Sequence, residues 1–91
     1  MKHAGPVTLA QLAPLLKRLR SIEGLVERRP GVFYLRGRAF LHFHEDPAGV
    51  FADVRVDGDE FRRVALPSSE FEPFARRVAA AVEGLTTRRS G

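Results

Sequence analysis

The chain has 91 residues, of which 44% are hydrophobic, and this composition predicts one globular domain over residues 1–91 with a single core. The absence of cysteine excludes disulfides, thiolate zinc sites and a cysteine nucleophile. The protein is basic, with a net charge of +4, and the excess lies in residues 1–38, which carry eight basic and two acidic side chains. A charge of this size attracts polyanions without specifying one.

The first residues lack the apolar core of a signal peptide, and no hydrophobic run is long enough to cross a bilayer. We therefore expect a soluble cytoplasmic protein of bacterial type that does not contact a membrane. Residues 1–7 and 86–91 are expected to be flexible ends.

A helix is predicted to begin at residues 8–11, which match a capping box with Thr8 as the N-cap. Hydrophobic residues then recur at helical spacing, at Leu9, Leu12, Leu16, Leu19 and Ile22. Pro14 lies too deep for the first turn, so either the helix kinks there or a helix begins near it. Gly24 indicates the end of this helical segment.

The middle of the chain predicts a four-stranded antiparallel meander. Residues 25–29 fit neither a helix nor a strand clearly. Runs rich in β-branched and aromatic residues, separated by turn signals, occupy residues 32–36, 40–46, 50–56 and 61–66.

The first hairpin of this meander has two candidate registers. A three-residue loop over residues 36–38 pairs Tyr34 with Phe40 and Phe33 with Leu41. A two-residue loop would turn the first strand over relative to the second. We favour the three-residue loop because it pairs similar side chains.

The second hairpin has a better determined register. A loop over residues 46–49 pairs Phe43 with Ala52 and places His42 directly opposite Asp53. Alternation then separates the hairpin into two faces. The apolar face comprises Leu41, Phe43, Val50, Ala52, Val54 and Val56. The opposite face presents Phe40, His42, His44, Phe51, Asp53 and Arg55.

A C-terminal helix is predicted from a capping box at residues 69–72 to a stop at Gly84. Its buried stripe comprises Phe71, Phe74, Val78, Val82 and Leu85. The fold class is therefore α+β: a helix, a four-stranded antiparallel meander and a helix, with both helices on one face of the sheet. The uncovered side, called the open face below, includes Tyr34, Phe40, His42, His44, Phe51, Asp53 and Arg55.

The open face is the candidate site for function. Burial of its aromatic side chains between two copies predicts a homodimer. The sequence holds no phosphate-binding glycine pattern, and Ser68 and Ser69 are typical of helix caps rather than nucleophiles. We therefore expect a non-enzymatic domain without catalytic residues or an organic cofactor.

Two alternative roles rest on the same face. In the first, a weak nucleic-acid-binding module, aromatic side chains stack on bases while arginines meet phosphates. In the second, His42 and His44 project to one side of a strand and bind a divalent metal together with Asp53. A local explanation also exists, in which His42 only forms a cross-strand hydrogen bond with Asp53.

The run from Pro30 to Arg55, with PGVFYLRGRAFLHFHEDPAG as its main part, resembles a motif of small bacterial proteins that have no established activity. More remotely, the helix–meander–helix order is similar to the MmcQ/YjbR-like proteins, a small α/β architecture proposed to bind DNA. The resemblance implies a compact fold and a DNA partner, and it assigns no site residue.

Overall fold

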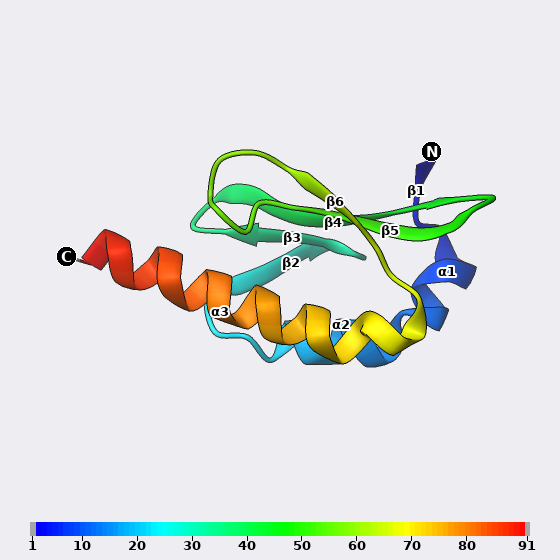
Figure 1. Ribbon diagram of the computed structural model, residues 1–91, viewed down its shortest axis with the longest axis horizontal. Coiled ribbons are helices and arrows are strands. Elements are labelled where there is room, and N and C mark those ends of the chain that lie inside the picture. Colours follow the sequence, from blue (N-terminus) through cyan, green and yellow to red (C-terminus); the bar gives the residue numbers. More distant parts are fainter. Residues whose placement is uncertain (1, 91) are drawn as a thin grey trace.

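The chain forms a six-stranded antiparallel sheet with its helices on one side (Figure 1). The computed structural model describes the backbone of residues 2–90 and the side chains of residues 2–87. In chain order the elements are β1 (Lys2–His3), α1 (Pro6–Gln11), α2 (Ala13–Arg20), β2 (Leu25–Arg29), β3 (Val32–Leu35), β4 (Arg38–Asp46), β5 (Gly49–Val54), β6 (Arg62–Ala65), a 3-10 turn (Ser68–Glu70) and α3 (Phe71–Ser90). The predicted α+β class is confirmed.

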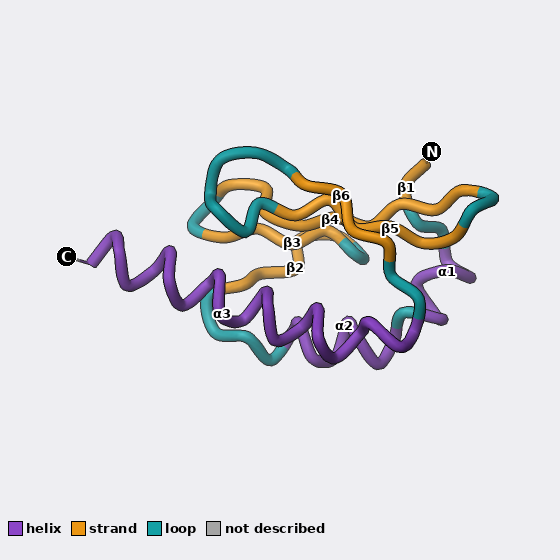
Figure 2. Tube along the Cα trace, viewed as in Figure 1, coloured by secondary structure: helices purple, strands orange, loops and turns teal. Residues whose placement is uncertain are grey.

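The sheet order is β2-β3-β4-β5-β6, and β1 pairs with the end of β4 that extends beyond β3. Figure 2 shows α2 and α3 lying beneath the sheet, where the two helices contact each other. The meander therefore has five strands instead of the predicted four, because residues 25–29 form β2. Residues 2–3, within the segment predicted to be flexible, form β1, while residues 1 and 91 lie outside the described residues.

Pro14 separates two helices, which confirms the alternative in which a helix begins near it. α2 starts at Ala13 and holds Pro14 in its first turn. Backbone N–H groups in the first turn of a helix make no hydrogen bond within the helix, so the missing N–H of proline costs nothing there. The predicted N-cap at Thr8 is wrong, because α1 begins at Pro6 with Gly5 as its N-cap and Thr8 is a buried residue inside it. A proline at the first helical position has its φ fixed near the helical value, so α1 begins at Pro6, before the predicted start at Thr8.

The core lies between the sheet and the helices. The apolar stripes predicted for the helices face this core. Its fully buried side chains include Leu12, Leu15, Leu19, Phe33, Leu41, Phe43, Val54, Phe74 and Val78. Leu9, Ile22, Phe71 and Leu85 pack against this cluster while partly exposed.

α3 begins at Phe71 after a 3-10 turn and not at a capping box, and it continues past the predicted stop at Gly84 to Ser90. No helix in residues 2–90 is long and apolar enough to cross a membrane.

A β-bulge in β4 corrects the predicted face of Phe40. β3 pairs Phe33 with Leu41 as predicted, but it pairs Tyr34 with Ala39, so Phe40 is an extra residue in β4. The extra residue puts neighbours on the same side: Phe40 is 3% exposed and Leu41 is fully buried. Phe40 therefore belongs to the core and not to the open face. The preferred three-residue loop is also wrong, because Leu35 pairs with Arg38.

The β4–β5 hairpin has the predicted register. Phe43 pairs with Ala52 and His42 pairs with Asp53, and the pairing closes on Asp46 and Gly49. The alternation of apolar and polar residues beyond the bulge decides this register, because a slip of one residue would turn every side chain to the wrong face.

Glu27 connects the end of α2 to the turn between β2 and β3. Its carboxylate accepts hydrogen bonds from Arg20 Nε at 2.5 Å and Nη2 at 3.1 Å, and from the Gly31 backbone N–H at 2.9 Å. The bond from Arg20, more than the bond from Gly31, lowers the pKa of Glu27 below its ordinary value of 4.5. The ionised form of Glu27 therefore stabilises the fold.

We expect the Glu27→Gln variant to lose about 1–2 kcal/mol of unfolding free energy at pH 7 and clearly less at pH 3. A lowered folded-state pKa gives stability that is complete above about pH 4.5 and is lost as the pH falls through the folded value. Urea denaturation at the two pH values measures the difference. Glu83→Gln, an exposed change on α3, is the matched control. An equal loss at both pH values would contradict the prediction.

Candidate functional site: a histidine cluster on the open face

Three histidines from two strands meet on the open face. His42 and His44 stand two residues apart on β4 and project to the same side. His3 on β1 is paired with His44, and residues paired across antiparallel strands also share a face. The sequence prediction found His42 and His44 but missed His3, because only the long-range pairing of β1 places it there.

The imidazole rings form a compact group. Their centroids are 4.6 Å apart for His42 and His44, 5.1 Å for His3 and His44, and 5.8 Å for His3 and His42. One ring nitrogen from each residue lies within 4.8 Å of the other two. This triangle, called the histidine cluster below, is the only group of potential metal ligands of its kind among the described residues.

Two nitrogens of the cluster are buried without a hydrogen-bond partner. His42 Nδ1 and His44 Nε2 are inaccessible to solvent, and neither makes a hydrogen bond within the described part of the chain. His44 Nε2 lies 3.0 Å from Asp53 Oδ2, an ion-pair distance, but the direction of approach is not that of a hydrogen bond. Buried polar atoms are normally satisfied, so the unpartnered His42 Nδ1, which has no carboxylate beside it, is a reason to consider a ligand.

Asp53 stands beside the cluster and is held by Arg63. Arg63 donates from Nε to Oδ1 at 3.0 Å and from Nη2 to Oδ2 at 3.2 Å, so the pair is bidentate. This bond lowers the pKa of Asp53. Asp53 is opposite His42 in register, as predicted, but its close contact is with His44. The predicted hydrogen bond from His42 to Asp53 is therefore replaced by this contact.

His42 is partly buried beneath an aromatic ring. The Phe61 ring covers it edge-on, with ring centroids 5.0 Å apart. Burial first, and then the neighbouring His44, lower the pKa of His42, while Asp53 opposes this shift. Its imidazole is therefore neutral at pH 7, with a lone pair on one nitrogen.

Two acidic residues near the turn take structural roles instead of joining the cluster. Glu45 projects to the other side of β4 and accepts the Gly5 backbone N–H at 2.6 Å, with Lys2 Nζ at 3.8 Å. Glu45 thus fastens the segment that carries His3 to β4. Asp46 accepts the Ala48 backbone N–H at 2.7 Å and stabilises the β4–β5 turn.

The predicted aromatic surface is smaller than expected. Phe40 is in the core, which leaves Tyr34 and Phe51 half-buried on the open face. The Arg28 guanidinium covers the Tyr34 ring at 4.7 Å from its centroid. Arg55 lies over Phe61 at 4.2 Å and at the edge of a cavity described below. The platform for stacking on bases is reduced accordingly.

The cluster has the composition of a transition-metal site. Neutral imidazole is a ligand for zinc, copper, iron and nickel, and a carboxylate behind a ligating histidine is a frequent orienting partner. A comparison of the chain with models of known families, with curated proteins and with solved structures finds no match.

Proposed function

We propose that the protein binds a divalent transition metal ion, zinc in the first place, through His3, His42 and His44. The observation that carries the proposal is the approach of three imidazole nitrogens to within 4.8 Å of one another on one face of the sheet. Three histidine ligands and an open fourth position are an established arrangement for zinc. His3 takes the place that the sequence prediction gave to Asp53.

The required adjustment of the cluster is small. Zn–N bonds of about 2.0–2.1 Å in tetrahedral geometry place ligand nitrogens roughly 3.3 Å apart, so the widest separation must close by roughly 1.5 Å at most. His3 is exposed and lies on a two-residue strand, so it is the member of the cluster whose side chain can rotate without disturbing the core.

Asp53 supports the cluster as an orienting residue in this proposal. When His44 carries its proton on Nε2, facing Asp53 at 3.0 Å, Nδ1 is left free to ligate. Arg63 holds the Asp53 carboxylate from the other side with two hydrogen bonds, so the carboxylate stays beside His44.

The experiment is zinc titration of the untagged protein by isothermal calorimetry, because an affinity tag would add histidines. We expect one zinc per chain, and a loss of affinity of more than about 100-fold in His42→Ala, since outer-shell partners alone contribute about 10–100-fold. Asp46→Asn is the matched control because Asp46 stabilises the turn of the same strand. Zinc binding that survives in His42→Ala would contradict the proposal.

We propose self-association through the open face as a second candidate role. Val26 is 54% exposed and Phe61 is 38% exposed, beside the half-buried Tyr34 and Phe51. A second copy covering these apolar side chains would stabilise a homodimer. Mass measurement at high protein concentration tests it, and a strict monomer would contradict it.

A further inference from the structure

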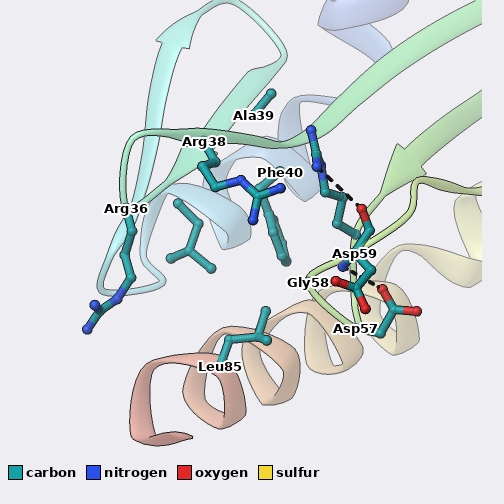
Figure 3. Close-up of a pocket in the computed structure, with 10 residues that line it drawn as sticks. Arg36, Arg38, Ala39, Phe40, Asp57, Gly58, Asp59 and Leu85 are labelled. Carbon is teal, nitrogen blue, oxygen red and sulfur yellow. Dashed lines mark hydrogen bonds between the residues drawn. The ribbon is translucent and has the colours of Figure 1, made fainter. Parts of the chain in front are cut away.

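A cavity of about 280 Å³ lies at the end of the sheet away from β1 (Figure 3). Its walls come from the β3–β4 turn, the loop after β5 and α3. Leu35, Phe40 and Leu85 give it an apolar floor, and Arg38 and Arg55 stand at its wall. Pockets for drug-sized ligands measure about 300–1,000 Å³, so this volume suits a smaller molecule.

The bulge in β4 builds this cavity. It turns Phe40 inward beneath the β3–β4 turn, and the Arg38 side chain and the Phe40 ring both point toward the space above Leu85 (Figure 3). Arg36 lies at the outer edge with its guanidinium directed away in the same view. An apolar floor next to a cationic wall matches a ligand that has both characters.

The Arg55 guanidinium has one unpaired and one weakly paired hydrogen-bond donor among the described residues. Its Nε is buried and makes no hydrogen bond among the described residues, and Nη1 donates to the Asp59 carbonyl oxygen at a long 3.4 Å. The guanidinium is also fixed over the Phe61 ring at 4.2 Å. A guanidinium that is positioned by stacking and left with free N–H groups is prepared to bind an oxyanion.

The two acidic residues of the wall neutralise this charge only in part. Asp57 is engaged by Arg62 Nη2 at 3.3 Å and by the backbone N–H groups of Asp59 at 2.9 Å and Glu60 at 3.3 Å. Asp59 contributes its carbonyl oxygen to Arg55. Of the charged side chains that line the cavity, Arg36, Arg38 and Arg55 are cationic and Asp57 and Asp59 are acidic, so the lining carries a net positive charge.

We propose that this cavity binds a small amphipathic carboxylate, with the carboxylate held by Arg55 and Arg38 and the apolar part on Phe40 and Leu85. This site uses none of the histidines and does not depend on the metal proposal, although the Phe61 ring under Arg55 also contacts the His42 ring.

The experiment is a titration of the full 91-residue protein with sodium octanoate at fixed ionic strength, followed by amide shifts in ¹H–¹⁵N NMR spectra. We expect saturable shifts confined to the β3–β4 turn, residues 57–59 and the α3 segment around Leu85. Affinity should fall about tenfold or more in Arg55→Gln, because a charge-assisted hydrogen bond is lost. Arg77→Gln, an exposed arginine change on α3, should leave it unchanged.

Three results would overturn the proposal. Equal binding of 1-octanol would mean that the arginines contribute nothing, and equal binding of inorganic phosphate would mean that the apolar floor contributes nothing. Octanoate affinity unchanged in Arg55→Gln would exclude the assigned contact. If Arg55→Gln does not fold, Arg38→Gln, which removes an exposed side chain, carries the same expected loss.

Discussion

Replacement of Phe40 by alanine is expected to lower the free energy of unfolding by about 3–5 kcal/mol, the usual cost of removing a buried phenylalanine. The Phe40 side chain is only 3% exposed and belongs to the core between the sheet and the helices. A domain of this size has a total stability of about 5–14 kcal/mol, so the loss is a large fraction of it. Urea denaturation followed by circular dichroism measures the change.

Phe51→Ala is the matched control for this prediction. Phe51 lies on the neighbouring strand, on the open face, and is only half-buried. Its removal leaves no closed cavity, so we expect a loss of about 1 kcal/mol. The strict alternation of the sequence places Phe40 and Phe51 on the same face and predicts similar losses. Similar measured losses would therefore contradict the bulge in β4.

Zinc at about 100 times its dissociation constant is expected to raise the free energy of unfolding by about 2.7 kcal/mol, because it binds the folded chain and not the unfolded one. Most of this gain should disappear in His3→Ala, because His3 is the ligand that joins β1 to β4. Thermal or urea unfolding with and without zinc measures the gain, and a chelator should reverse it.

In the same measurement, Asp53→Asn distinguishes the proposed ligands His3, His42 and His44 from the set His42, His44 and Asp53 predicted from the sequence. If Asp53 only orients His44, the asparagine variant should bind zinc about 10–100-fold more weakly and still be stabilised at saturating zinc. If Asp53 is a ligand and His3 is not, the asparagine variant should lose the gain and His3→Ala should keep it. That second pattern would restore the set predicted from the sequence.

Local patterns in the sequence determined much of this protein. The alternation along residues 41–56 determined the register of the β4–β5 hairpin and put His42, His44 and Asp53 on one face. Helical spacing of the apolar residues identified the buried sides of α2 and α3. These features are predictable because each depends on residues close together in the chain.

Tertiary structure alone decided the rest. The bulge at Phe40 moves one aromatic residue to the core, because the pairing with β3 passes from Ala39 to Leu41 and leaves Phe40 on the same side as Leu41. α3 passes Gly84, although glycine is a common helix stop, and Leu85 directly after it packs against the core. β1 has two residues and no pattern of its own, and its pairing with β4 brings His3 to the cluster. A contact between residues about 40 positions apart leaves no local signal, and for that reason the third histidine was found only in the structure.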